Sequence, residues 1–402
     1  MRITVPVLVV TALVVCSVAR AGEGPVIFQS EGKHLAAAKA RMGQADGDLK
    51  KALNEIRERA EKGLTFKLVT VIDKPFTPPS GDKHDYMSLS PYWWPDPGKP
   101  DGKPFIRKDG EFNPEREKYD LPHMEAMADA CEGLAMGYYF FGDEKYAEKA
   151  AQLMRAWFIA PETRMNPNCR YAQFIPGVEE VDRSAGVIET NRLRDCVDAD
   201  GLLQGSKHWS EDDSKQLKAW FKEMLTYLIE SEQGKKEQAA PNNHGTWWGV
   251  QATTYALFLG DEELAKQLIL KHGRDRIKKQ IEPDGRQPEE LERTKAFDYS
   301  RFNILAHEDL AMLGQRVGID LWNYQTDDGR SLRKAIDWMA PFISGDQKWQ
   351  YKQIAAPKLK EAATVLRRAA NAYQEPKYEQ AIAKMKDGAS PMTNLLFPAE
   401  NK

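Results

Sequence analysis

The sequence is poor in cysteine and has no excess of basic residues, and both shortages narrow the classes of protein that it can encode. Only four cysteines occur among 402 residues, and no Cys-x-x-Cys pair or Cys/His cluster has the spacing of a zinc site, so we expect no metal. There are 57 Lys and Arg against 60 Asp and Glu. This balance argues against nucleic acid as a partner, because binding to phosphates requires clustered positive charge. The cysteines beyond the N-terminal segment allow one disulfide and a free thiol: Cys131, Cys169 and Cys196.

Several motifs that mark familiar catalytic sites are absent. The sequence contains no Gly-x-Gly-x-x-Gly, no Walker loop, no His-Glu-x-x-His and no Gly-x-Ser-x-Gly. Paired acids do occur, as in Glu179-Glu180 and Glu289-Glu290, but we expect most of them on solvated faces. No pair stands out as the two carboxyl groups that a glycoside hydrolase needs.

Long apolar runs are also missing, except at the N-terminus. Residues 5–18 are nearly all apolar, Arg2 precedes them, and Ala19-Arg20-Ala21 has the small-x-small pattern of signal peptidase. We therefore expect a signal peptide over residues 1–21, cleaved after Ala21, and a periplasmic or secreted protein. Residues 22–402 are expected to form one domain without a membrane span, since no later run reaches about 18 apolar residues.

What the sequence does contain is helical periodicity over most of its length. Two segments echo each other, YFFGDEKYA (139–147) and LFLGDEELA (257–265), and in each an apolar helix ends at Gly and a new helix begins at Asp. Repeated helical hairpins predict an all-α fold, an α/α barrel built as an incomplete toroid. The best candidate strand, residues 66–72, is short. Apolar residues recur with helical spacing in the following segments: 34–64, 121–141, 143–158, 184–204, 210–232, 244–259, 261–280, 299–317, 330–343 and 357–372.

Residues 65–117 interrupt the helical pattern with a long irregular segment rich in proline and glycine, and long loops in compact proteins tend to be functional. Its centre is DYMSLSPYWWPD, which places Tyr86, Tyr92, Trp93 and Trp94 close together. Flat aromatic rings beside polar groups suit the binding of sugar rings. The alternative is that the tryptophans fill one end of the barrel core.

A second cluster, PNNHGTWW, stands where the helix expected over 244–259 begins. Asn242 or Asn243 can cap that helix, and a single Asn is enough for a cap. The other amide and His244 would then lie free at the positive end of a helix, where an anionic ligand is favoured. The alternative is a structural role for all three residues.

A third cluster, RTKAFDYSRFN, places Tyr299 and Asn303 four residues apart on one expected helical face, with Arg293 just upstream. An Arg near a Tyr can lower the pKa of the phenol from about 10. The alternative is a buried Tyr whose hydroxyl is satisfied and an Arg in a surface ion pair.

A fourth cluster, NPNCRYAQFIPG, is a polar loop bounded by prolines. Here Asn168, Tyr171 and Gln173, followed by Arg183, could form hydrogen bonds with a polar ligand. Ordinary capping of the loop is the alternative.

Taken together, these blocks resemble the alginate lyase superfamily, the α/α-barrel polysaccharide lyases. The sequence looks closest to polysaccharide lyase family thirty-eight and is more distantly similar to family five. The resemblance covers about residues 80–345 and rests on four blocks in the same order: DYMSLSPYWWPDP with DGKPFIRKDGEFNPE, MNPNCRYAQFIPG, NNHGTWW with ALFLGDEELA, and FDYSRFNILA.

The resemblance implies cleavage of a 1,4-linked polyuronate by β-elimination, with an anionic polysaccharide as partner and no cofactor. Matching the family's Asn-His pair and its downstream Arg and Tyr selects the catalytic residues Asn243, His244, Arg293 and Tyr299. The segment VEEVDRSAG departs from the expected glycine-rich stretch, so Arg183 is not carried over. The expected substrate-binding residues are Tyr86, Trp93, Trp94, Tyr171, Gln173, Asn242 and Asn303.

Elementary chemistry agrees with these roles. The proton to be removed lies on C5, next to a carboxylate that opposes further negative charge, so Asn243, His244 and Arg293 would neutralise it. Tyr299 would take the C5 proton and protonate the glycosidic oxygen when both lie on one face of the sugar. If they lie on opposite faces, His244 is the better base. We expect mannuronate-rich alginate as substrate, with glucuronan, a non-catalytic sugar-binding role and a glycoside hydrolase as alternatives; the sequence does not predict the oligomeric state.

Overall fold

The computed structural model describes residues 24–178 and 183–400, so the expected signal peptide and Glu179-Glu180 lie outside the described residues. Helices dominate these residues. The first eight are α1 (Gly32–Ala40), α2 (Gly47–Leu64), α3 (Asp120–Phe141), α4 (Glu144–Met154), α5 (Arg194–Leu202), α6 (Glu211–Glu230), α7 (Glu232–Ala239) and α8 (Asn243–Phe258). They are followed by α9 (Glu262–Leu268), α10 (Arg274–Gln280), α11 (Pro288–Leu291), α12 (Ala296–Arg316), α13 (Leu332–Ser344), α14 (Leu359–Tyr373), α15 (Pro376–Lys384) and α16 (Pro391–Leu396).

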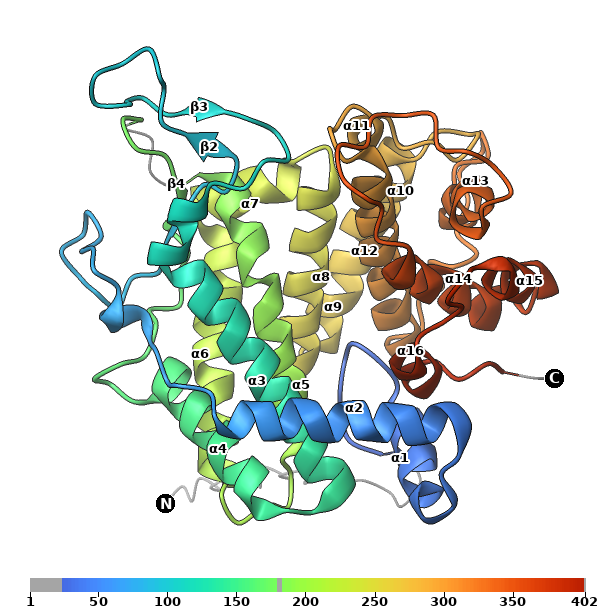
Figure 1. Cartoon of the computed structure of the whole chain (residues 1–402), viewed down its shortest axis with the longest axis horizontal. Helices are drawn as coiled ribbons and strands as arrows, with labels where there is room; N and C mark the ends of the chain where they lie inside the picture. Colours follow the sequence, from blue (N-terminus) through green and yellow to red (C-terminus); the bar gives the residue numbers. More distant parts are fainter. Residues whose placement is uncertain (1–23, 179–182, 401–402) are drawn as a thin grey trace, which may run out of the picture.

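The helices pack as a ring. In chain order, α2, α3, α5, α8, α12 and α14 each contact the next, and α16 contacts both α14 and α2. Figure 1 shows α3, α5 and α8 running alongside one another, with α2 lying across one end of them. This arrangement is the all-α toroid of helical hairpins that the sequence predicts, and the predicted fold class is confirmed.

The turns of the two echoing hairpins form as predicted. Gly142 and Gly260 adopt the left-handed conformation, with φ of 69° and 80°, which glycine reaches at little cost. Asp143 and Asp261 then cap the next helices, α4 and α9, by accepting hydrogen bonds from backbone N–H groups. These turns reverse the chain and set neighbouring helices antiparallel.

Other local predictions were wrong. The expected helix over 34–64 is broken between α1 and α2, and the one expected over 184–204 begins as a 3-10 helix (Ser184–Leu193). Residues 66–72 do not form a strand, because no neighbouring strand pairs with them: the carbonyl of Val69 accepts a hydrogen bond from the indole of Trp157 instead. The last two residues of this segment belong to a short 3-10 helix (Val71–Asp73).

The long irregular segment crosses one end of the toroid. Its β1 (Met87–Leu89) pairs in parallel with β4 (Tyr171–Phe174), and β2 (Trp93–Trp94) pairs antiparallel with β3 (Ile106–Arg107). The β2–β3 hairpin projects from the body of the protein (Figure 1). Beneath it lies a small second core, separate from the main helical core.

Two further observations concern disulfides and membrane spans. The three cysteines of the described residues are buried and no disulfide joins them, so the disulfide that the sequence allowed does not form. Within 24–178 and 183–400, no helix is both long and apolar enough to cross a membrane.

Candidate active site

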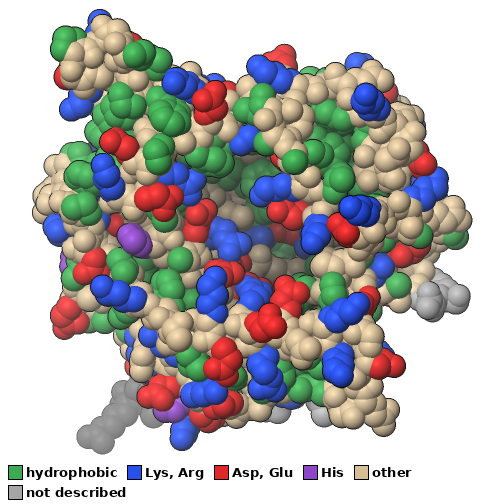
Figure 2. Space-filling model, in the orientation of Figure 1, with side chains coloured by type: hydrophobic (Ala, Val, Ile, Leu, Met, Phe, Trp, Pro, Cys, Tyr) green, Lys and Arg blue, Asp and Glu red, His purple; other side chains and the backbone are tan. Residues whose placement is uncertain are grey.

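A cavity of about 1140 Å³ opens on the face shown in Figure 2, where Lys and Arg side chains gather along its floor and rim. Its lining includes eight Lys or Arg and six Asp or Glu side chains. Pockets for drug-sized ligands measure roughly 300–1,000 Å³, so this cavity has room for an oligomer. The excess of cations favours a ligand that carries negative charge.

The first residues of α8 form one wall. Asn242 is the cap: its side chain accepts a hydrogen bond from the backbone N–H of His244 at 3.2 Å. Gly245 follows because a Cβ there would lie 2.4 Å from the carbonyl oxygen of Ala240. From α10, Gln280 donates a hydrogen bond to the carbonyl of Asn242 at 2.8 Å and so fixes the start of α8.

Because Asn242 provides the cap, Asn243 is available for another role. Its backbone and side-chain N–H groups donate to the two carboxylate oxygens of Glu290 at 2.6 and 2.8 Å. Its Oδ1 is buried and has no hydrogen-bond partner among the described residues. Glu290 is buried within α11, so the prediction of a solvated face was wrong for this residue. Burial raises the pKa of Glu290 to about 7, although the bonds from Asn243 oppose this.

His244 is held by a second buried acid. Its Nδ1 lies 2.7 Å from Oε1 of Glu237, a residue of α7 that is only 1% exposed. Burial alone would lower the pKa of His244, but the charge and hydrogen bond of Glu237 outweigh it, and the pKa is raised. The contact with Glu237 fixes the orientation of the ring and leaves Nε2 for a ligand.

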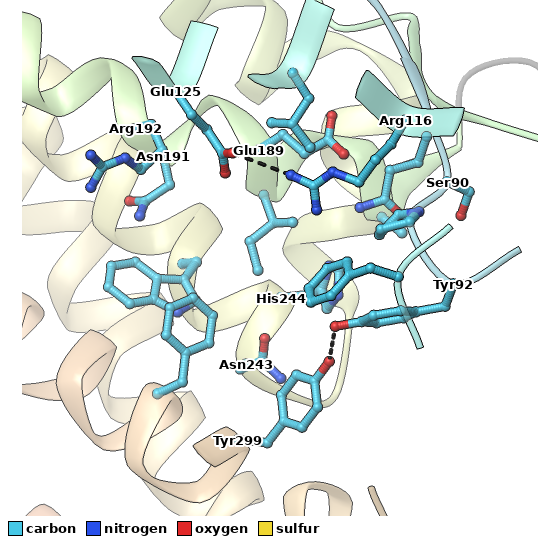
Figure 3. A pocket seen from close by; sticks show the side chains of 18 of the residues that line it. Ser90, Tyr92, Arg116, Glu125, Glu189, Asn191, Arg192, Asn243, His244 and Tyr299 are labelled. Atoms are coloured by element: carbon cyan, nitrogen blue, oxygen red, sulfur yellow. Dashed lines mark hydrogen bonds and ion pairs between the residues drawn. The ribbon is translucent and has the colours of Figure 1, made fainter. Parts of the chain in front are cut away.

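Tyr299, near the start of α12, contacts the aromatic segment. Its hydroxyl is 2.8 Å from that of Tyr92, and Figure 3 shows this contact beside Asn243 and His244. Burial and Tyr92 raise the pKa of Tyr299 well above its usual value, and Arg293 offsets this only in part. The predicted lowering of this pKa was therefore wrong: Arg293 faces the ring and not the hydroxyl, with its guanidinium carbon 3.7 Å from the ring centroid.

Arg293 joins the site to the long irregular segment. Its Nη2 lies 2.8 Å from Oδ1 of Asp109, and Nε makes a longer contact with Oδ2. The backbone N–H and hydroxyl of Thr294 also donate to Asp109. These bonds outweigh the effect of burial and hold the pKa of Asp109 well below its usual range. Asp109 therefore stays ionised. Because Nε and Nη2 of Arg293 contact Asp109, Nη1 is the nitrogen of this guanidinium that remains for a substrate.

The structure brings together seven of the eleven residues selected from the sequence. Gln173 enters the cavity with a positive φ of 52°, a strained conformation for a non-glycine residue, and its N–H donates to Ser88 Oγ. Arg183, which the resemblance did not carry over, also lines the cavity, with its guanidinium carbon 5.6 Å from the ring centroid of Trp93. The predicted residues in the lining are Trp93, Gln173, Asn242, Asn243, His244, Arg293 and Tyr299.

Tyr86 and Tyr171 lie outside the lining. Tyr86 is fully buried, and its hydroxyl donates to Glu189 at 2.9 Å. Tyr171 belongs to the small core beneath the β2–β3 hairpin. Tyr86 therefore holds Glu189, a residue of the lining, from its buried side.

Trp94 and Asn303 are also outside the lining, for reasons of strand and helix geometry. Successive residues of a strand point to opposite faces, so Trp93 faces the cavity and Trp94 turns away and donates to the carbonyl of Glu111. Asn303 is fully buried and donates to the side chains of Gln280 and Gln287. It braces the loop that holds α8 and does not face a ligand.

The sequence-based selection missed several residues that shape the site. Tyr92 was recognised as part of the aromatic cluster but was not selected as a site residue. Asp109 and Glu290 act on partners distant in sequence and offered no signal, whereas Glu237 precedes its partner His244 by only seven residues. Gln29, which lines the cavity from the N-terminal segment, was also missed. Among the described residues no group of three or more His, Cys, Asp or Glu is placed to hold a metal ion.

Comparison with known proteins bears on this site. A model of the family described as alginate lyase matches residues 70–349. The chain is 37% identical to an alginate lyase from Bacteroides ovatus whose crystal structure superposes with a TM-score of 0.90, over 94% of this chain and 100% of that one. The chain belongs to the alginate lyase family. The predicted superfamily and a polysaccharide lyase activity are thereby confirmed, whereas the closer resemblance to family thirty-eight stays a prediction.

More distant structures share the fold. Alginate lyase A1-III from Sphingomonas species A1 is 13% identical and superposes with a TM-score of 0.53 over 87% of this chain and 95% of that one. A variant of alginate lyase A1-III complexed with a tetrasaccharide is 14% identical, with a TM-score of 0.56 over 96% and 98% of the two chains. A search of curated proteins found no match for this chain.

Proposed function

We propose that this lyase cleaves 1,4-linked, mannuronate-rich alginate by β-elimination, with Tyr299 moving the protons. The observation that carries the proposal is the convergence of Tyr299, His244 and Asn243 in one cavity with cationic lining. The tetrasaccharide complex of alginate lyase A1-III supports an oligosaccharide in such a cavity. No cofactor is part of this proposal.

The first task is to neutralise the carboxylate next to C5. Removing the C5 proton spreads negative charge onto that group, and donors aimed at it stabilise the transition state. His244, oriented by Glu237, provides Nε2, and Arg293 provides Nη1. Asn243 is fixed by Glu290, which carries a proton over part of the neutral range because its pKa is about 7. A protonated Glu290 also reduces the negative charge near the substrate.

The second task is proton transfer. In mannuronate the C5 proton and the C4 oxygen lie on the same face of the sugar, so one group can serve both. Tyr299 as phenolate would take the C5 proton, and the phenol so formed would protonate the leaving oxygen. Tyr92 can donate its hydroxyl hydrogen to the phenolate at 2.8 Å, and the guanidinium of Arg293 faces the ring. General acid–base catalysis of this kind contributes roughly 10²–10⁴-fold.

Glucuronan is the closest alternative substrate, because glucuronate differs from mannuronate only at C2. A comparison of the two polymers tests the proposal directly. The product of elimination contains a conjugated C4=C5 double bond, which absorbs in the ultraviolet. We expect a rapid rise in absorbance with mannuronate-rich alginate and a much slower one with glucuronan; the reverse order would favour glucuronan lyase.

We also propose that the protein acts outside the cytoplasm, as a periplasmic or secreted enzyme. The support is the pattern of residues 1–21, with an apolar stretch and a small-x-small end. Sequencing of the N-terminus of the protein recovered from the periplasm or medium tests this. A mature chain beginning at Gly22 is the expected result, and an intact Met1 on cytoplasmic protein would contradict it.

A further inference from the structure

A segment near the N-terminus of the described chain, Ile27 to Ser30, is held by two helices of the ring and contributes Gln29 to the cavity lining. On one side, the N–H groups of Phe28 and Gln29 donate to the carboxylate of Asp198 in α5, at 2.6 and 3.1 Å. On the other side, Arg316 of α12 donates to the carbonyls of Ile27 and Ser30. The segment therefore spans from α5 to α12, across the interior of the ring.

Within this segment, the side chain of Gln29 is partly exposed and lines the cavity. Its Nε2 donates to Oδ1 of Asp195 at 2.9 Å, and its Oε1 accepts from Nη2 of Arg194 at 3.0 Å. These two contacts fix the plane of the amide. A carboxamide has two N–H donors and an oxygen with two lone pairs, so one donor and one acceptor position remain for a ligand.

Along the axis of α12, Gln29 is held far from the catalytic residues. Arg194, which holds Gln29, also pairs with Asp309 of α12 at 2.8 Å. Asp309 follows Tyr299 by ten residues on the same helix, which corresponds to about 15 Å along its axis at 1.5 Å per residue. The pair of Arg194 and Asp309, which holds Gln29, is thus anchored further along α12 than Tyr299 by more than the width of one side chain.

The wall between the two levels is suited to a sugar. Trp247 and Phe302 both line the cavity, and their ring centroids are 4.7 Å apart. They lie one turn further along α8 and α12 than His244 and Tyr299, respectively. Trp247 is buried against Phe302, and the partly exposed ring of Phe302 offers an apolar surface to the C–H groups of a sugar ring.

Several side chains of the cavity lining have buried polar atoms without a hydrogen-bond partner among the described residues. They include Nε1 of Trp247 and Oδ1 of Asn191. Leaving a buried donor or acceptor unpaired costs about 1–3 kcal/mol, and such groups usually have a reason. A polar ligand in the inner part of the cavity would provide one.

We propose that Gln29 is a substrate-binding residue, whose oriented amide binds neighbouring hydroxyl groups of a sugar unit lying deeper in the cavity than the unit that is cleaved. The inference rests on the proposed function and extends it to a second subsite. Hydroxyl groups fit better than a carboxylate, because a hydroxyl both donates and accepts, whereas a carboxylate only accepts. The carboxylate of Asp195 beside Gln29 would also repel a second carboxylate. Gln29 lies outside residues 70–349, so the family match does not account for it.

The test compares Gln29→Ala with Gln44→Ala, an exposed glutamine of the same N-terminal region that lies outside the cavity. Both changes are placed in a Tyr299→Phe background, and binding of a mannuronate tetrasaccharide is measured by calorimetry. We expect the dissociation constant to rise about tenfold for Gln29→Ala, on the scale of one or two lost hydrogen bonds, and to stay the same for Gln44→Ala. In the active enzyme, Gln29→Ala should raise KM and leave kcat within about twofold.

Gln29→Met separates a binding role from a structural one. It keeps the bulk of the side chain and removes its hydrogen bonds, so under the proposal it should weaken binding as much as Gln29→Ala. A structural role predicts instead that Gln29→Met restores binding. Unchanged binding by Gln29→Ala would overturn the proposal. So would weaker binding that comes with a lower unfolding temperature and is restored by Gln29→Met. Failure of the proposed function is seen separately, as wild-type protein that forms no absorbing product from alginate.

Discussion

The guanidinium of Arg293 lies against the face of the Tyr299 ring, with its central carbon 3.7 Å from the ring centroid. This position lets the cation attract the electrons of the ring while Asp109 holds its Nη2 and Nε edge. Burial and Tyr92 still dominate, so the pKa of Tyr299 is raised and the free enzyme contains the neutral phenol. The phenol is ready to act as an acid, and its action as a base requires the minor phenolate form.

The dependence of the rate on pH follows from this protonation state. If Tyr299 is the base, kcat/KM on mannuronate-rich alginate should rise about tenfold per pH unit from neutral pH upward, because the phenolate fraction grows in that proportion. The measurement is a pH–rate profile at low substrate concentration, limited to pH values at which the protein stays folded. A plateau just above neutral pH would instead identify His244 as the base.

Replacing Tyr299 by Phe removes only the hydroxyl. We expect turnover to be lost by at least about 10³-fold, within the range of general acid–base catalysis, with substrate binding retained. Tyr324→Phe is the matched control, since Tyr324 is not part of the cavity lining. Absorbance assays and calorimetry on both variants check this, and near-normal turnover by Tyr299→Phe would exclude the proposed role.

The neighbouring asparagines of α8 should separate stability from catalysis. Asn242→Ala removes the cap and should lower the free energy of unfolding by about 1 kcal/mol. Asn243→Ala should lower kcat about 10²-fold or more, as expected for a donor that stabilises developing negative charge. Urea unfolding and kinetics on the pair test this difference. An Asn243→Ala protein that is unfolded, or folded and fully active, would not fit.

Glu189 offers a test of the buried electrostatics. Burial raises the pKa of Glu189 to about 7, although hydrogen bonds from Ser88 and Tyr86 oppose this. The folded state therefore holds its proton more tightly than the unfolded state, whose carboxyl has a pKa of about 4.3. The stability that this group contributes is complete below about pH 4, falls as pH rises, and is lost above pH 7.

Glu189→Gln should remove this contribution. Between pH 4 and pH 8, the free energy of unfolding of wild type should fall by up to about 3 kcal/mol more than that of the variant. Chemical denaturation at a series of pH values measures the difference. Parallel curves for the two proteins would show that Glu189 does not titrate as described.

The sequence predicted the architecture well because helical periodicity and hairpin turns are local signals. Gly142 with Asp143, and Gly260 with Asp261, form the expected turns within a few residues of chain. The strand expected at residues 66–72 failed because a strand needs a partner, and pairing is not a local property. The carbonyl of Val69 is used by Trp157, which is distant in sequence.

The candidate site likewise combines residues that local motifs indicate with residues that only long-range packing brings in. His244 and Tyr299 could be selected from short motifs, whereas the acids that orient the site could not. Glu290 looked like half of a surface acid pair, and only the packing of α11 buries it against Asn243. Similarly, Asp109 pairs with Arg293 across 184 positions of sequence. Gln29 lines the cavity because residues 27–30 run between α5 and α12, and no local sequence pattern indicates this course of the chain.

The most direct test of the central claim follows two products of one reaction. New reducing ends and ultraviolet absorbance are measured together while the wild-type protein acts on mannuronate-rich alginate. Elimination predicts one unsaturated sugar for each new reducing end, at every time point. Reducing ends that accumulate without absorbance would mean that water is added across the broken bond, and the elimination mechanism would be wrong.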